Sequence, residues 1–141
     1  MRENSASKNQ LNGIMIVNNN IEIQYSSLAV KEIIDRLESL LLVKGVTIYA
    51  RIDQQAEAAR TGLELPELEF ILFGNPKAGG ALISLNPLVA LDLPLKVVAW
   101  KEDIGRTAIA YNTLDFISDR YALAREVLGA VDLSGIIKQI V

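Results

Sequence analysis

The segment from Phe73 to Ala81 has the clearest potential for binding chemistry. It reads Phe-Gly-Asn-Pro-Lys-Ala-Gly-Gly-Ala and connects two apolar stretches. Glycine lets backbone N–H groups approach a ligand, a following helix start favours an anion, and Lys77 adds a positive charge. A tight turn between a strand and a helix, without any ligand, is the simpler interpretation of the same residue types. Both interpretations stay open at this stage.

This segment does not match a nucleotide-binding P-loop. Gly74 and Gly79 have four residues between them, as a P-loop requires, but Gly80 and Ala81 stand where Lys and Ser or Thr are needed. Without that hydroxyl the segment offers no ligand for a magnesium ion. The sequence therefore predicts no magnesium-nucleotide chemistry.

Asp53 and Glu57 are the second group of interest. Two carboxylates four residues apart can hold a hard cation or act as general acid and base. A helix start is the simpler interpretation, because an Asp cap and a Glu in the first turn both complement the helix dipole. Arg60 is also placed to pair with Glu57. No metal site is predicted here.

The amino-acid composition excludes several classes of function. Cys and His are absent from the 141 residues, which excludes disulfides, Cys/His zinc sites and His-dependent triads. Every serine thus lacks a histidine partner, so the sequence predicts no catalytic residue and identifies no cofactor. Fourteen basic and seventeen acidic residues give a net charge of −3, and no nucleic-acid partner is expected.

The length fits one domain, since half of the residues are hydrophobic and 22% are charged. Residues 1–13 are polar and lack the apolar region of a signal peptide, so we expect a disordered lead-in followed by one domain over 14–141. The longest apolar runs are too short to cross a bilayer. These features predict a cytoplasmic protein without a membrane partner.

Apolar periodicity predicts both helices and strands. Val30 to Leu41 has helical spacing, with Ser26 or Ser27 as its N-cap and Gly45 at its end. Period-two patterns and turn signals predict strands over 14–17, 21–25, 46–52, 68–73, 94–100 and 106–111, and the even-numbered residues of 46–52 should share one face. Further helices are expected over 54–61, 81–91 with an interruption at Pro87, 113–120, 122–128 and 134–140. This order predicts an α+β fold, with helices packed on a mixed, mostly antiparallel sheet.

Four blocks closely resemble the Domain of Unknown Function 302 family. They are Arg51-Ile52-Asp53, Phe73-Gly74-Asn75-Pro76-Lys77 with Gly79, Leu91-Asp92-Leu93-Pro94-Leu95-Lys96-Val97, and Tyr111-Asn112. Their order and spacing match over residues 25–121. The resemblance implies a small bacterial or archaeal α+β domain with a TATA-binding-protein-like sheet, of β-α-β(4)-α type, that forms a homodimer. It implies no established activity and no DNA binding, because a fold does not determine a function.

Two positions depart from the family pattern. The family usually has Ile-Asp-His where this chain has Ile52-Asp53-Gln54, and Gly-Thr-Pro where this chain has Gly79-Gly80-Ala81. Gln54 can donate and accept hydrogen bonds, but it cannot shuttle protons. A role in binding therefore survives this exchange better than a role in catalysis.

Three hypotheses follow. The first is a homodimeric domain that binds a small molecule or small anion, with these ligand-binding residues: Asp53, Gln54, Asn75, Lys77, Gly79 and Gly80. The second is a non-catalytic homodimeric assembly module, in which Trp100 and the apolar C-terminus form an interface. The third is an enzyme of unknown reaction, for which the sequence offers no recognisable set of catalytic residues.

Overall fold

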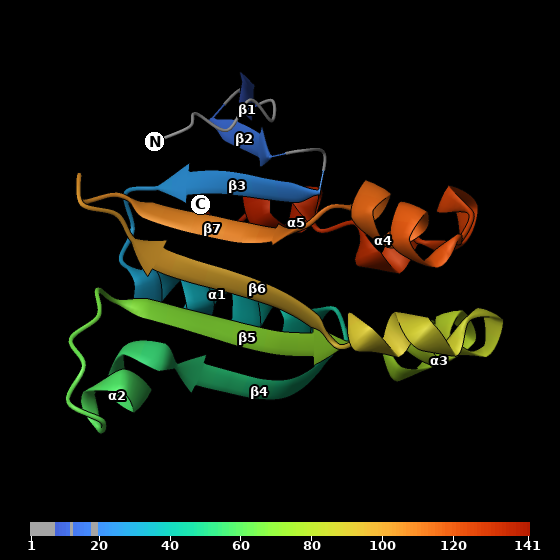
Figure 1. Ribbon diagram of the computed structural model, residues 1–141, viewed down its shortest axis with the longest axis horizontal. Helices are drawn as coiled ribbons and strands as arrows, with labels where there is room; N and C mark the ends of the chain where they lie inside the picture. Colours follow the sequence, from blue (N-terminus) through green and yellow to red (C-terminus); the bar gives the residue numbers. More distant parts are fainter. Residues whose placement is uncertain (1–7, 12, 18–19) are drawn as a thin grey trace.

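Seven strands form one sheet in which every neighbouring pair is antiparallel (Figure 1). The computed structural model describes residues 8–11, 13–17 and 20–141. In spatial order the sheet runs β1-β2-β3-β7-β6-β5-β4. The strands are β1 (Lys8–Leu11), β2 (Ile14–Val17), β3 (Ile21–Ser26), β4 (Thr47–Asp53), β5 (Leu68–Gly74), β6 (Leu95–Lys101) and β7 (Thr107–Asn112). The predicted α+β class with a mostly antiparallel sheet is confirmed.

The helices lie behind the sheet and at its ends (Figure 1). Helix α1 (Val30–Val43) packs on β4, β5 and β6, and α5 (Ser134–Lys138) contacts β3. Helices α3 (Pro76–Leu85) and α4 (Leu114–Tyr121) extend beyond one end of the sheet, and α2 (Gln54–Ala59) lies near the other end. Three 3₁₀ turns complete the chain: η1 (Pro87–Leu91), η2 (Arg125–Val127) and η3 (Gly129–Val131). Within the described residues, no helix has the length and apolar character needed to cross a membrane.

The hydrophobic core lies between α1, the C-terminal segment and one face of the sheet. Helix α1 places four side chains in it with no exposed surface: Ile33, Ile34, Leu37 and Leu41. The C-terminal Ile137 is fully buried and Ile140 is 3% exposed, and both belong to this core. The apolar C-terminus, which the assembly hypothesis placed at an interface, therefore packs mainly inside the domain.

Strand β4 departs from the predicted alternation because it contains a bulge. Ile48 pairs with Phe73, whereas Ala50 pairs with the next residue of β5, Leu72, so Tyr49 is the extra residue. Ile48 and Ala50 consequently face opposite sides of the sheet. The prediction that they share one face is wrong, since period two holds only in an unbroken ladder.

The start of α1 also differs from the prediction. The helix begins at Val30 after Ala29, which makes no side-chain cap. Ser26 Oγ instead accepts a hydrogen bond from the N–H of Leu28 at 3.0 Å, inside the preceding turn. The helix end is as predicted, because Gly45 follows it with a φ of 75°.

The N-terminal segment contains more structure than predicted. Strand β1 lies within residues 1–13, which we expected to be disordered. Its pairing with β2 begins with Lys8 opposite Val17 and ends with Leu11 opposite Ile14. Strands β2 and β3 form the expected antiparallel hairpin. Residues 1–7, 12 and 18–19 lie outside the described residues.

Shortening Leu37 to Ala should lower the free energy of unfolding by about 2–5 kcal/mol, because the side chain is fully buried and its loss leaves a cavity. Chemical denaturation measures this change. Leu42→Ala is the matched control on the same helix, since Leu42 is 57% exposed, and it should change stability by less than about 0.5 kcal/mol. Equal losses in the two variants would contradict this account of the core.

Candidate functional site

Residues 74–80 form the start of α3 and not the expected loop. Asn75 is the N-cap, and its Oδ1 accepts hydrogen bonds from the N–H groups of Lys77 at 3.0 Å and Ala78 at 3.1 Å. Pro76 occupies the first turn, and the N–H of Gly79 already donates to the Asn75 carbonyl at 2.7 Å. The predicted helix over 81–91 therefore begins five residues earlier, at Pro76, and its interruption near Pro87 is confirmed.

This change weakens the case for an anion-binding loop. Two N–H groups of the first turn are already paired with the Asn75 side chain. Gly79 and Gly80 lie inside a regular helix, with no positive φ. An unusual backbone conformation therefore does not require glycine at either position.

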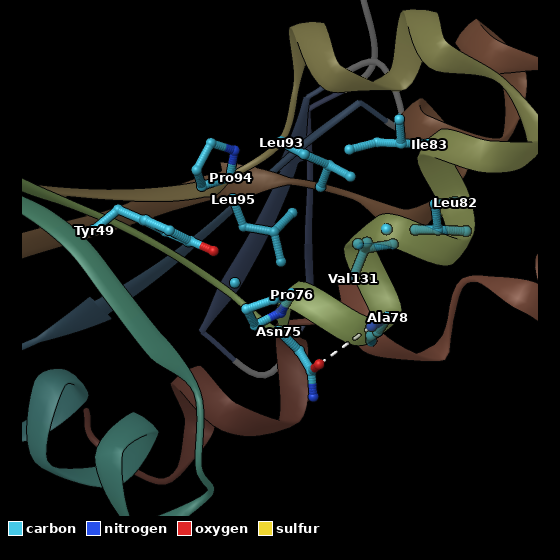
Figure 2. A pocket seen from close by; sticks show the side chains of 14 residues that line it. Tyr49, Asn75, Pro76, Ala78, Leu82, Ile83, Leu93, Pro94, Leu95 and Val131 are labelled. Atoms are coloured by element: carbon cyan, nitrogen blue, oxygen red, sulfur yellow. Dashed lines mark hydrogen bonds between the residues drawn. The ribbon is translucent and has the colours of Figure 1, made fainter.

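A cavity of about 380 Å³ lies against this helix start, at the end of the sheet (Figure 2). One wall is formed by the first turns of α3, another by the segment that leads into β6, and a third by Val131 of η3. Its apolar lining includes the side chains of Leu82, Ile83, Leu93, Pro94 and Leu95. The polar groups at its rim come from Tyr49 and Asn75. The site can therefore hold a small molecule that is mainly apolar.

Two glycines border this cavity. A Cβ atom added at Gly79 would lie 4.0 Å from Cδ1 of Leu93, which also lines the cavity. A Cβ atom at Gly74 would lie 3.6 Å from Tyr49 Cε2. Any larger side chain at these positions would extend into the space between α3, the bulge of β4 and the segment before β6.

The structure brings together only some of the sequence-predicted residues. Asn75, Gly79 and Gly80 line the cavity, whereas Lys77 is exposed on α3 and is absent from its lining. Asp53 and Gln54 lie at the opposite end of β5, because Asp53 pairs with Glu69 while Thr47 pairs with Gly74. The two regions thus do not share this cavity, and a ligand role for Asp53 and Gln54 stays a separate prediction.

Asp53 has the capping role expected from the sequence. Its Oδ1 accepts a hydrogen bond from the N–H of Ala56 at 2.9 Å, at the start of α2. Glu57 pairs with Arg60 at 3.0 Å, again as expected. Among the described residues, no group of three or more Asp and Glu side chains is arranged to hold a metal ion.

Sequence reasoning missed the far wall of the cavity. Leu93, Pro94 and Leu95 belong to a block that the sequence analysis singled out, but nothing in the linear sequence places that block beside Asn75. The contact arises because β5 and β6 are antiparallel neighbours, with Phe73 opposite Leu95. The end of one strand and the start of the other therefore meet.

A family model described as "Domain of unknown function DUF302" matches residues 21–140, which is most of the chain. The chain belongs to the DUF302 family. The crystal structure of an uncharacterised conserved DUF302 protein from Bacillus stearothermophilus is similar, with a TM-score of 0.76 and 20% identity, over 86% of this chain and 98% of that chain. This similarity supports the fold and does not indicate an activity.

Three curated relatives of this DUF302 chain have names that refer to a channel. Segments of the Fluoride-specific ion channels FluC 1 of Brucella suis and of Brucella abortus, and FluC 2 of Brucella melitensis, are each 33% identical over 95 residues. The match covers 67% of this chain but only 35–37% of those proteins. The chain therefore spans little more than a third of their length.

A second, polar cavity of about 280 Å³ lies beside β3 and β7 of the DUF302 chain. Tyr111 is 4% exposed there, and its hydroxyl donates to Glu22 Oε2 at 2.5 Å. The same hydroxyl accepts a hydrogen bond from Gln24 Nε2 at 2.7 Å, and that amide also donates to the Ser134 carbonyl at 3.1 Å. This network ties two strands to the start of α5, so its evident role is structural.

Replacing Tyr111 by Phe should flatten the loss of stability at high pH. Burial, followed by the hydrogen bond to Glu22, raises the pKa of Tyr111 above its ordinary value of 10.0. The unfolded chain therefore loses this proton at a pH where the folded chain keeps it, and the free energy of unfolding falls as the pH rises above 10. Removing the phenol removes that contribution to the slope.

Denaturation series between neutral pH and high pH measure the effect. Tyr49→Phe is the matched control, because Tyr49 is 52% exposed and lies outside this network. At neutral pH, Tyr111→Phe should also cost about 1–3 kcal/mol, since it leaves buried polar groups without their partner. If both variants have the same slope, the network does not hold the Tyr111 proton.

Proposed function

We propose that the protein is a small-molecule-binding domain that uses the cavity between α3 and the segment before β6. The observation that supports this is the cavity of about 380 Å³ with a mainly apolar lining. Ligand sites in proteins have volumes of about 300–1,000 Å³, apolar walls and a few placed polar groups. The amide of Asn75 and the hydroxyl of Tyr49 supply the polar groups at the rim.

The lining favours a neutral, largely apolar ligand over a small anion. An anion needs free N–H donors or a cation, yet Asn75 occupies the N–H groups of Lys77 and Ala78. The Lys77 ammonium is exposed outside the cavity and can contribute only at its edge. We infer a ligand with an apolar body in the cavity and one polar group near Asn75.

We also propose that the domain acts as a homodimer. Most oligomers of a single chain are symmetric, and two-fold dimers are the most frequent. The enzyme hypothesis has less support, because the described residues that line the cavity beside α3 include no Ser, Thr, Asp, Glu, Lys or Arg side chain. The ligand-binding function needs no such side chain.

Gly79→Leu should lower the affinity for a neutral apolar probe about tenfold or more, which equals about 1.4 kcal/mol. The probe is N-phenyl-1-naphthylamine, whose fluorescence rises in an apolar site. The leucine side chain would occupy the cavity, and a helix accepts leucine better than glycine, so the variant should fold. Unchanged affinity in a folded Gly79→Leu protein would contradict the proposed site.

The matched control is Lys77→Leu, on the same helix but outside the cavity, which should keep the affinity for the neutral probe. A sulfonated probe of the same shape, 8-anilinonaphthalene-1-sulfonate, tests the anion. If Lys77→Leu weakens only the sulfonated probe, a charge at the rim contributes to binding. If it leaves both affinities unchanged, the ligand is recognised by the apolar lining alone.

A second candidate function is the binding of fluoride in an accessory role beside a channel. One observation favours it: chains named as fluoride-specific ion channels contain a segment 33% identical to this one. In this alternative the small anion predicted from the sequence is fluoride. The relatives named as channels are much longer than the segment that this domain matches.

Adding sodium fluoride to the isotope-labelled protein should then shift a defined set of amide signals in a saturable way. Sodium chloride at the same ionic strength is the control and should leave those signals in place. NMR titration measures both. Identical small shifts with the two salts would reject fluoride binding by this chain.

A further inference from the structure

The sheet has two apolar faces, and the core covers only one of them. Residues paired across neighbouring strands share a face, so the registers assign these side chains to the face away from α1: Ile23, Tyr25, Phe70, Leu72, Val98, Trp100, Ala108 and Ala110. We call this set the open face. In Figure 1 no helix passes in front of β3, β7 or β6. The intervening residues, such as Ile71, Val97 and Ile109, belong to the core.

The open face forms an apolar layer separate from the core. None of its members belongs to the core cluster or packs against it. Ala108 is nevertheless fully buried and Ala110 is 9% exposed. Tyr25 and Trp100 pair with Ala108 from either side, so the two alanines form the floor of a shallow trough between larger side chains.

Two cations lie at opposite ends of the face. Lys96 Nζ lies 4.8 Å from the centre of the Phe70 ring, at the end of β6 near α3. The Arg106 guanidinium lies 3.6 Å from the centre of the Tyr25 ring, at the opposite end. Both cations stack on aromatic rings, and the middle of the face is apolar. The larger side chains of the face are half-buried, so each leaves part of its apolar surface open to water, where a partner can cover it.

The flat footprint of the face is about half of the area that each partner buries in a stable dimer. Four strands at about 4.8 Å spacing, each with six residues at about 3.4 Å, span roughly 19 by 20 Å, a flat footprint of about 400 Å². Side-chain relief increases the accessible area beyond this footprint. A stable interface buries about 800 Å² on each partner, which is of the same order.

We propose that the open face is the surface through which two copies of this chain associate, sheet against sheet. The inference rests on the homodimer proposed above and locates its interface. A two-fold contact uses the same patch on both subunits. Large side chains of one copy can therefore pack into the trough of the other copy. Face-to-face sheets pack about 10 Å apart with interdigitated side chains, and the alanines of β7 give the room for this.

The test is the mass in solution of the full chain and two variants, measured by light scattering after size exclusion over a wide dilution range. Wild type should be a dimer, and Ala110→Arg should be a monomer, because it places a charge in the trough. Val98→Asp is a second variant on the neighbouring strand, in case Ala110→Arg does not fold. Circular dichroism establishes that each variant is folded.

The matched control is Leu88→Arg, which adds the same charge at an exposed apolar position, 63% exposed, away from the sheet. It should remain a dimer. Trp100 is the single tryptophan and lies on the open face, so its emission should shift to the red on dissociation of wild type and be red-shifted at all concentrations in Ala110→Arg.

Two results would overturn the proposal. A wild-type monomer at every concentration would reject the homodimer itself. A dimer that persists in folded Ala110→Arg and Val98→Asp would place the interface on another surface. Neither result bears on the cavity beside α3, whose probe binding is measured separately, so the two proposals fail independently.

Discussion

The register of β5 between β4 and β6 is the constraint on which the rest of the domain depends. Phe73 lies opposite Ile48 on one side and Leu95 on the other. This pairing brings the start of α3 next to the segment that enters β6, and the cavity forms between them. A slip by one residue would exchange the two faces of the strand and remove Ile71 and Phe73 from the core. The register of β5 therefore determines both the packing of the core and the position of the cavity.

The same period-two alternation explains why the domain has two apolar surfaces with different roles. One face buries side chains against α1, where each large aliphatic residue contributes about 1.5–3 kcal/mol on burial. The other carries Phe70, Val98 and Trp100 without a helix over its central strands. Central strands with apolar residues on both faces are typical of sheets covered on both sides. The helices of the monomer cover one side, and the proposed dimer would cover the second.

Most of the fold could be predicted from the sequence because its signals are local. The apolar spacing of α1, the turn before β7 and the Asp53 cap each depend on a few adjacent residues. The predictions failed where tertiary contacts override local preference. Gly79 and Gly80 suggested a loop but lie in a helix, and the bulge at Tyr49 reversed the facing of part of β4.

The candidate site was only partly predictable for the same reason. Asn75, Gly79 and Gly80 were chosen for their turn chemistry, and the structure places them in a helix start that lines a mainly apolar cavity. The opposite wall, Leu93 to Leu95, carries no chemical signal in an apolar segment. Asp53 was considered both as a ligand and as a helix cap, and its carboxylate caps α2.

The two adjacent glycines of α3 are unusual for a helix that borders a cavity. A glycine inside a helix costs about 1 kcal/mol relative to alanine, and this helix has two in succession. Neither has a positive φ, so backbone conformation does not require them. A Cβ atom at Gly79 would make only an ordinary contact, 4.0 Å from Leu93 Cδ1, so alanine would fit and would stabilise the helix. Glycine adds no side chain to the helix surface beside the cavity, and this is what the proposed ligand site requires.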